Sequence, residues 1–283
     1  MRIIKSVAEM QAYSDSLRSK NIKIGFVPTM GALHDGHLSL VKKSTETADQ
    51  TILSIFVNPV QFTPSEDFNE YPRDFRTDEE SARDNGVDVI FYPSEEEIYP
   101  DGYSTFSVVE GLSDILEGAS RPSHFKGVTT IVNKLFNIVN PQIAFFGQKD
   151  AQQAVIIKKM VTDLNLNVGI IVCPTIRESD GLALSSRNTF LTREEREQAP
   201  LIYKALTRAE SLHSEGKHES SGIISLIEEI ISAATLAKID YVAAVDEVTL
   251  QPVESTTSGA LVAIAVSFSA TRLIDNTVLP PMD

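Results

Sequence analysis

One stretch of this chain decides its fold: Pro28-Thr29-Met30-Gly31-Ala32-Leu33-His34-Asp35-Gly36-His37. The apolar run Ile22–Val27 precedes it and is typical of a buried strand, and Leu38–Lys43 follows it and is typical of a helix. The first N–H groups of a helix are unpaired and its dipole favours negative charge, so a strand, a glycine-bearing turn and a helix start together form an anion-binding corner. His34 and His37 lie three residues apart and therefore share one face of the first helical turn. The stretch thus predicts a site where a nucleoside triphosphate is attacked at its α-phosphate.

Short apolar runs alternate with helical patterns through the first two-thirds of the chain. The runs are rich in Val, Ile and Phe and nearly continuous in apolarity, as strands buried on both faces are. We expect strands at Lys23–Val27, Thr51–Val57, Val87–Tyr92, Gln142–Phe146 and Val168–Cys173, and helices at Gly36–Ala48, Arg73–Asn85, Val128–Val139 and Ala151–Leu164. The alternation predicts an α/β fold with a Rossmann-like, doubly wound parallel sheet. Such sheets bind ligands at the carboxyl ends of their strands, near a switch in strand order.

The pattern changes after Pro174. We expect amphipathic helices at Arg193–Ser214 and Ser220–Leu236, and then strands at Ile239–Val245 and Leu261–Ser267. The chain therefore divides into a Rossmann-like domain at residues 1–175 and a smaller C-terminal α+β domain at residues 176–283. A loop at such a boundary is where a lid would be placed.

Composition narrows the class of protein. With 283 residues and 42% hydrophobic content, the chain can bury a large core. The net charge is −14, and the sequence shows no basic stripe of the kind that nucleic-acid binders carry. A polyphosphate ligand must therefore be bound by a local cluster of cations. The single cysteine, Cys173, excludes an internal disulfide and indicates a buried core residue. The N-terminus lacks a signal-peptide pattern and no run has the length of a membrane span, so we expect a soluble, cytoplasmic protein.

Two further clusters offer cations to phosphates. Lys149, in Gly147-Gln148-Lys149-Asp150, is a compact positive charge at a strand end and suits a phosphate; the alternative is a lysine that is simply solvated. Asp150 either contacts the ligand or caps a helix. Gln153 lies one helical turn beyond Asp150 and can face the same cleft. Ser185, Ser186 and Arg187 combine two hydroxyls with a forked cation, which suits a leaving pyrophosphate. The alternative is a loop whose hydroxyls bond their own backbone.

A fourth cluster is Phe56-Val57-Asn58-Pro59-Val60-Gln61-Phe62. Gln61 offers both a donor and an acceptor, as a small hydroxy acid requires, and Asn58-Pro59 also reads as a turn. Arg121 and His124 either approach phosphates or cap the helix that follows. His213 and His218 are expected to be exposed, and we give them no role.

Together and in this order, the four clusters resemble the pantothenate synthetase family, whose members are pantoate–β-alanine ligases. The resemblance covers almost the whole chain. The histidine turn matches the H-x-G-H signature that nucleotidyltransferases and class I aminoacyl-tRNA synthetases share, and the other three clusters narrow the match to one family. Leu184 stands where many members have methionine, and this volume-conserving exchange is expected to have little effect.

The resemblance implies a two-step reaction in which pantoate attacks the α-phosphorus of ATP, and β-alanine then attacks the pantoyl adenylate. It implies catalytic roles for His37 (as proton donor), His34, Lys149, Ser185, Ser186 and Arg187. It implies nucleotide contacts from Met30, Gly31, Ala32, Leu33, His34, Asp35, Gly36, His37, Gly147, Gln148, Lys149, Asp150, Ile176, Leu184, Ser185, Ser186 and Arg187. It implies pantoate contacts from Thr29, Met30, Gln61 and Gln153, and a β-alanine contact from Gln61. It also implies Mg²⁺, with no carboxylate assigned to it, and a homodimer.

Three other functions share part of this pattern. A nucleotidyltransferase acting on a phosphate-bearing substrate would have the histidine turn but would not need Gln61 and Gln153. A class I aminoacyl-tRNA synthetase is disfavoured because the acidic C-terminal part offers no RNA-binding surface. A non-catalytic nucleotide sensor would tolerate loss of the cations that stabilise only the transition state.

Overall fold

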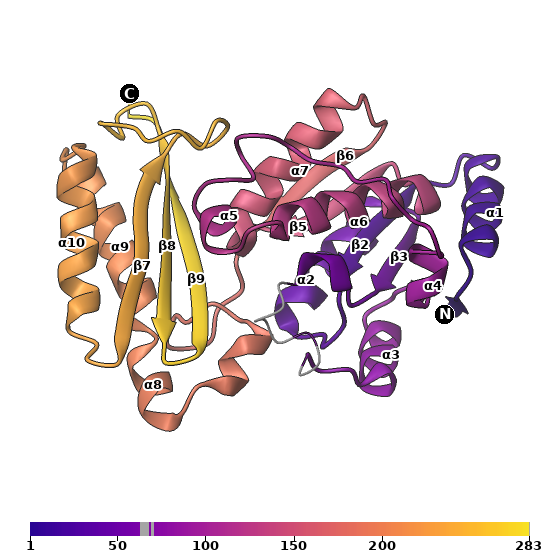
Figure 1. Cartoon of the computed structure of the whole chain (residues 1–283), viewed down its shortest axis with the longest axis horizontal. Helices are drawn as coiled ribbons and strands as arrows, with labels where there is room; N and C mark the ends of the chain where they lie inside the picture. Colours follow the sequence, from indigo (N-terminus) through magenta and orange to yellow (C-terminus); the bar gives the residue numbers. More distant parts are fainter. Residues whose placement is uncertain (63–67, 69–70, 283) are drawn as a thin grey trace. The chain divides into compact units, whose positions relative to one another are not determined.

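The computed structural model of the chain describes residues 1–62, 68 and 71–282 (Figure 1). The chain forms two compact units, which we call the N-terminal unit (residues 1–147 and 152–174) and the C-terminal unit (residues 148–151 and 175–283). The segment 148–151, which the sequence places in the first domain, therefore clusters with the C-terminal unit.

The described part of the N-terminal unit contains a six-stranded sheet in the order β1-β4-β3-β2-β5-β6. Its strands are all parallel and comprise β1 (Arg2–Ile4), β2 (Ile24–Thr29), β3 (Gln50–Ile55), β4 (Val89–Phe91), β5 (Ile143–Gly147) and β6 (Gly169–Cys173). From β2 the chain runs outward through β3 and β4, and it then returns to the other side of β2 at β5. The predicted doubly wound sheet is thus confirmed, with its switch in strand order between β2 and β5.

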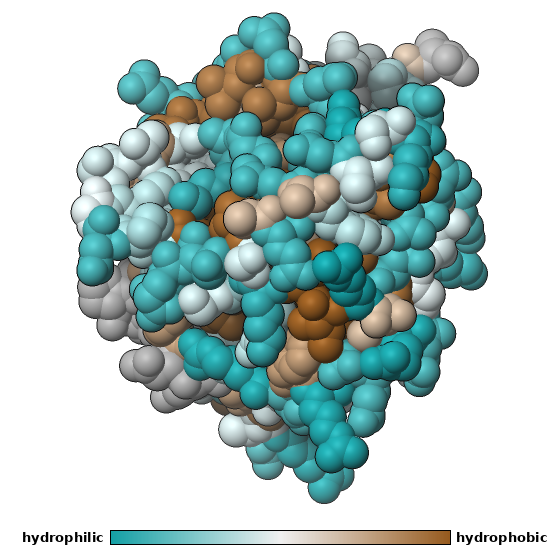
Figure 2. Space-filling model, turned by 90° about the vertical axis from the view of Figure 1, so that its right-hand side faces the viewer, coloured by the Kyte–Doolittle hydropathy of each residue, from teal (hydrophilic) through white to brown (hydrophobic). Residues whose placement is uncertain are grey.

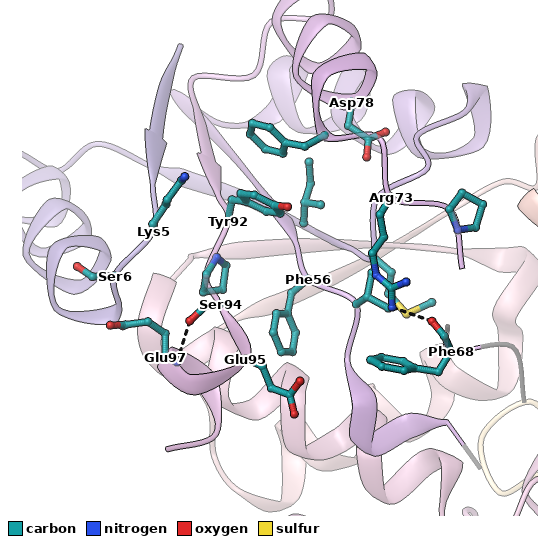
Figure 3. Close-up of a pocket in the computed structure, with 16 residues that line it drawn as sticks. Lys5, Ser6, Phe56, Phe68, Arg73, Asp78, Tyr92, Ser94, Glu95 and Glu97 are labelled. Carbon is teal, nitrogen blue, oxygen red and sulfur yellow. Dashed lines mark hydrogen bonds between the residues drawn. The ribbon is translucent and has the colours of Figure 1, made fainter. Parts of the chain in front are cut away.

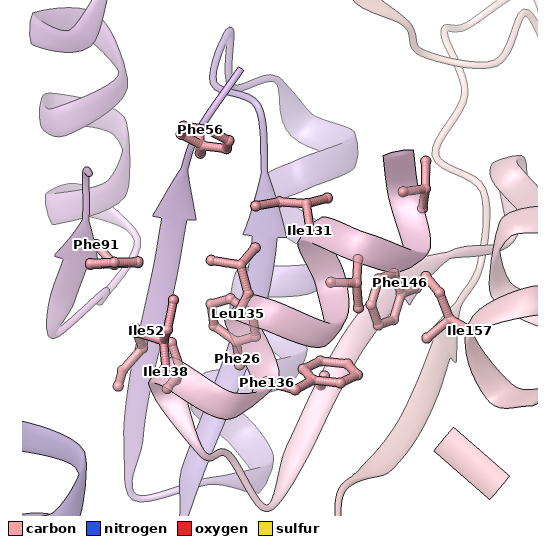
Figure 4. Close-up of a cluster of buried hydrophobic side chains, with 14 of the residues drawn as sticks. Phe26, Ile52, Phe56, Phe91, Ile131, Leu135, Phe136, Ile138, Phe146 and Ile157 are labelled. Atoms are coloured by element: carbon pink, nitrogen blue, oxygen red, sulfur yellow. The ribbon is translucent and has the colours of Figure 1, made fainter. Parts of the chain in front are cut away.

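Helices cover both faces of this sheet. They are α1 (Val7–Arg18), α2 (Asp35–Thr47), α3 (Phe75–Asp84), α4 (Glu95–Ile98), α5 (Glu117–Ser120), α6 (His124–Val139) and α7 (Ala151–Asp163), with the 3₁₀ turn η1 (Pro59–Gln61). Successive strand residues point to opposite faces. Phe26 of β2 therefore packs with Leu135 and Phe136 of α6 in one core cluster (Figure 4), whereas its neighbour Val27 packs with α2 in another. Cys173 is buried in that second cluster, as expected.

The C-terminal unit contains an antiparallel sheet of β7 (Ala237–Val245), β8 (Ala260–Phe268) and β9 (Thr271–Leu279). Its helices are α8 (Arg193–Gln198), α9 (Leu201–Ser214) and α10 (Ser220–Ser232), with the 3₁₀ turns η2 (Gln148–Asp150) and η3 (Ser186–Phe190). α9 and α10 pack on the sheet through a shared apolar core (Figure 1). The single helix predicted for 193–214 is wrong, because Pro200 separates α8 from α9 and a proline disrupts a helix interior.

The expectation that His213 and His218 are exposed is also wrong. His213 is only 2% exposed, with Nδ1 2.8 Å from the Thr256 hydroxyl and Nε2 2.9 Å from the Pro280 carbonyl. His218 is half-buried and its Nδ1 lies 3.2 Å from Nδ1 of His213. These contacts join α9 to the end of β9, so the pair has a structural role in the C-terminal unit.

The surface is largely polar on the face shown in Figure 2, where hydrophobic residues form smaller patches between hydrophilic ones. Among the described helices, none combines the length and apolarity needed to cross a membrane.

Candidate active site

His34 and His37 begin helix α2 at the carboxyl end of β2. His34 is the N-cap, and its Nδ1 accepts the Gly36 N–H at 3.1 Å; Nδ1 of His37 accepts the His34 N–H at 3.4 Å. The two rings lie 4.1 Å apart between centroids, tilted by 38°. A backbone N–H can only donate, so each neutral ring carries its proton on Nε2, which makes Nε2 a hydrogen-bond donor. The histidines therefore cap the helix and also provide two N–H donors suited to anionic oxygens.

The turn before the histidines is held by Asp78, a residue of α3 that the sequence did not single out. Its carboxylate accepts the N–H of Ala32 at 3.0 Å and that of Leu33 at 2.7 Å. Ala32 has φ +50° and Gly31 φ +84°, and a Cβ at Gly31 would lie 2.8 Å from the carboxylate. Burial raises the pKa of Asp78 despite these two hydrogen bonds, which act in the opposite direction. Asp78 thus fixes a left-handed turn that L side chains rarely adopt.

Gln61 lies in η1 and is 9% exposed. Its Nε2 donates to Sδ of Met30 at 3.0 Å, so two predicted substrate-binding residues from separate loops meet here. The third, Thr29, is buried, and its hydroxyl donates to the Ser54 carbonyl at 2.7 Å. Thr29 therefore fixes the end of β2 against β3.

Arg121 and His124 support the backbone of Gln61. Nε2 of His124 lies 3.0 Å from Nη1 of Arg121, and Nδ1 lies 2.9 Å from the Gln61 carbonyl. A guanidinium only donates, so Nε2 of His124 accepts and Nδ1 donates to the carbonyl. These contacts hold Gln61 against the start of α6. They correspond neither to a phosphate contact nor to a helix cap, the two roles that the sequence left open for Arg121 and His124.

Gly127 of α6 lets the helix approach Gln61 closely. A Cβ at this position would lie 2.5 Å from Cα of Gln61. Alanine at a helical glycine ordinarily stabilises by about 0.5–1 kcal/mol, but Gly127→Ala is expected to lower the free energy of unfolding by about 1–3 kcal/mol because the backbone of Gln61 must shift. Denaturant unfolding would measure this change.

Gly222 of α10 is the matched control, because a Cβ there meets no atom within 4 Å. Gly222→Ala is therefore expected to raise the free energy of unfolding by about 0.5–1 kcal/mol. Equal effects of the two substitutions would contradict the close packing of α6 on η1.

A cavity of about 570 Å³ opens at the carboxyl edge of the sheet (Figure 3). Lys5, Phe56 and Tyr92 line it from the ends of β1, β3 and β4. Asp78 and Met30 also line it, so the cavity adjoins the turn that precedes the histidines.

Gln153, the remaining predicted pantoate contact, lies in the first turn of α7 and is half-buried.

In the C-terminal unit, Asn276 of β9 fixes the backbone around Lys149. Its Nδ2 donates to the carbonyls of Gln148 at 2.9 Å and Lys149 at 3.0 Å, and its Oδ1 accepts from Nε2 of Gln148 at 2.9 Å. The Lys149 side chain is 19% exposed, with Nζ 3.6 Å from Asp150. Asn276 therefore holds the main chain at Lys149 in a defined position.

The Ser185–Arg187 segment adjoins the same strand, because β9 packs against both η2 and η3. Oγ of Ser185 accepts the Arg187 N–H at 3.2 Å, which matches the alternative in which hydroxyls bond their own backbone. The Leu184 N–H donates to the Ile176 carbonyl at 3.0 Å, joining two predicted nucleotide contacts. Lys149, the two serines and Arg187 thus gather beside β9.

Asp275 and Asn276 are functional candidates that the sequence did not reveal. Both are buried, and Asp275 pairs with both terminal nitrogens of Arg177. Arg177 also lies over the Tyr203 ring, with its central carbon 4.1 Å from the ring centroid. The adjacent polar residues between Leu273-Ile274 and Val278-Leu279 are the signal that could have indicated them.

The described side chains form no cage of several metal-ligating groups. Among residues 1–62, 68 and 71–282, no group of three or more His, Cys, Asp or Glu side chains could hold a metal ion. We therefore derive no step from a metal bound by the protein.

Comparison with known proteins identifies the family of this chain. The family model described as pantoate-beta-alanine ligase matches residues 2–278. Pantothenate synthetases of Acetivibrio thermocellus and Moorella thermoacetica are 52% and 50% identical to this chain; the matches cover 99% of both chains for the first and 100% for the second.

Solved structures are similar over nearly the whole chain as well. The crystal structure of pantothenate synthetase from Thermus thermophilus is 42% identical in sequence, with a TM-score of 0.94 over 99% of this chain and 100% of that one. Pantoate-beta-alanine ligase from Francisella tularensis, complexed with beta-gamma ATP and beta-alanine, is 38% identical, with a TM-score of 0.81 over 98% and 97%. The chain therefore belongs to the pantoate-β-alanine ligase family.

Proposed function

We propose that this chain is a ligase that condenses pantoate with β-alanine and converts ATP to AMP and pyrophosphate. In the first step the pantoate carboxylate attacks the α-phosphorus, the bond to pyrophosphate breaks, and pantoyl adenylate forms. In the second step the β-alanine amine attacks the acyl carbon, an amide bond forms, and AMP leaves. Family membership and the paired Nε2–H donors of His34 and His37 support this reaction.

The first step needs alignment and charge stabilisation more than a base, because a carboxylate is already ionised at neutral pH. We assign the two imidazole N–H groups to phosphate oxygens that gain negative charge, with His37 as the proton donor. Lys149 and Arg187 supply positive charge to the phosphates, and Ser185 and Ser186 donate hydroxyl hydrogen bonds to the leaving pyrophosphate. Gly147 ends β5 and Lys149 follows two residues later, so the chain ties this cation to the strand next to β2.

The other predicted residues are assigned to the three substrates. We assign pantoate to Gln61, Gln153, Thr29 and Met30, and β-alanine to Gln61. We assign the nucleotide to the residues that the resemblance implies: Met30 to His37, Gly147 to Asp150, Ile176 and Leu184 to Arg187. The contact between Gln61 and Met30 supports the pantoate assignment, because it joins η1 to the turn that carries the histidines.

Magnesium, the oligomeric state and the cellular location stay predictions. We propose that Mg²⁺ arrives with ATP, with phosphate oxygens and water as most of its ligands. The homodimer and the cytoplasmic location rest on the resemblance and on the sequence pattern.

One experiment tests the proposed function. Purified protein is incubated with ATP, and pyrophosphate and AMP are measured with and without each acid. We expect pyrophosphate release only when pantoate is present, and we expect AMP and the amide product once β-alanine is added. Pyrophosphate release that ignores pantoate but responds to a phosphate-bearing substrate would instead favour the nucleotidyltransferase alternative.

A further inference from the structure

The side-chain amide of Asn58 is held in one orientation. Asn58 is 1% exposed and caps η1. Its Oδ1 accepts the Tyr99 hydroxyl at 2.8 Å and the Val60 N–H at 3.4 Å, while its Nδ2 donates to the Gly127 carbonyl at 3.1 Å. A backbone N–H only donates and a backbone carbonyl only accepts, so the reversed orientation would place like groups against each other on both sides. The environment thus determines which end of the Asn58 amide faces Gln61.

The orientation of Asn58 in turn determines that of Gln61. Nδ2 of Asn58 donates to Oε1 of Gln61 at 3.1 Å, so the Gln61 carbonyl oxygen lies on the Asn58 side. Nε2 of Gln61 then lies on the Met30 side, 3.0 Å from Sδ. A thioether is a weak acceptor, so an anionic oxygen of a ligand would replace it readily. Gln61 therefore presents an N–H donor, and not its carbonyl, on the side that carries the histidine turn.

We propose that Tyr99 is a positioning residue that, through Asn58, directs the N–H donor of Gln61 to an oxygen of the acid substrate. This inference rests on the proposed function, which assigns pantoate to Gln61. The backbone groups of Val60 and Gly127 decide which way the Asn58 amide turns, and the Tyr99 hydroxyl, whose hydrogen bond is shorter than that of Val60, holds Oδ1 in that place. The ligand group it selects is an acceptor oxygen, either a carboxylate or a hydroxyl oxygen.

The surroundings of Tyr99 suit a fixed donor. Its ring packs near Phe56, with centroids 6.2 Å apart, and edge-on to Tyr103 at 5.0 Å. Nζ of Lys134 lies 5.5 Å from the ring centroid. Burial raises the pKa of the Tyr99 hydroxyl, so this group keeps its proton at neutral and moderately alkaline pH. Without the hydroxyl, Oδ1 of Asn58 would be left with the longer bond from Val60.

Tyr99→Phe tests the proposal because it removes the hydroxyl and keeps the ring. We expect the KM for pantoate to rise about fivefold, the effect of losing one net hydrogen bond, with kcat and the KM for ATP nearly unchanged. Tyr103→Phe is the matched control: Tyr103 packs on Tyr99, Phe106 and Lys134, and its loss of a hydroxyl should leave all three constants unchanged.

The outcomes separate this proposal from the proposed function. An unchanged KM for pantoate in Tyr99→Phe would overturn the positioning role, even if the wild-type protein uses pantoate. Equal losses in kcat and in every KM would also overturn it, because they would indicate a general structural defect. A wild-type protein that releases pyrophosphate without regard to pantoate would instead reject the proposed function.

Discussion

Replacing Lys149 by alanine is expected to lower the rate of pantoate-dependent pyrophosphate release by a factor of about 10² or more, as loss of an oxyanion donor does. The proposed role of its ammonium group is to offset charge that develops on the phosphates as the α-phosphorus is attacked. Asn276 holds the Lys149 carbonyl, so the backbone that carries this side chain is fixed before the nucleotide binds. Single-turnover measurements at saturating ATP would report this step without product release.

Two further variants make the Lys149 result specific. Lys158→Ala removes an exposed lysine from α7 and is expected to leave the rate unchanged. Lys149→Arg keeps the charge but changes its shape and reach, so it should recover only part of the loss. A near-wild-type rate for Lys149→Ala would remove this residue from the mechanism.

The second large effect is expected at His37. His37→Ala should slow the exchange of labelled pyrophosphate into ATP by about 10²-fold or more, because it removes an N–H donor that stabilises negative charge in the adenylation step. Exchange depends on the first half-reaction alone, so the assay separates this step from amide formation.

The capping role of His37 needs its own control, since Nδ1 accepts the His34 N–H. His37→Asn keeps an oxygen that can accept this hydrogen bond but lacks a donor at the Nε2 position. We expect His37→Asn to retain the stability of the wild-type protein and to exchange pyrophosphate as slowly as His37→Ala. Recovery of exchange in His37→Asn would show that the cap alone is what the reaction requires.

The sequence predicts the parallel sheet well because its strands are buried on both faces. Continuous apolar runs mark β2, β3, β5 and β6, and the observed strands lie within two residues of the expected bounds. β1 is three residues long, and its partner β4 lies almost ninety positions away, so no local pattern marks it. The break at Pro200 was visible in the sequence, and the amphipathic pattern on both sides obscured it.

The parts of the site that sequence reasoning missed are those that depend on distant partners. Asp78 reads as a solvated helix residue, and it is buried because the N–H groups of Ala32 and Leu33 need an acceptor. Asn276 lies between the polar residues Asp275 and Thr277, and its partners lie more than 120 residues earlier in the chain. The histidine turn could be predicted because strand, turn and helix are contiguous.

The capping geometry of the two histidines also limits the acid–base chemistry of this corner. A neutral imidazole has one basic lone pair, and in both rings that lone pair points at a main-chain N–H. The pair can stabilise negative charge through its Nε2–H hydrogen bonds, but neither ring is set up to withdraw a proton from the ammonium group of β-alanine. The proton released as the amide bond forms must therefore leave by another route, to water or to a phosphate oxygen.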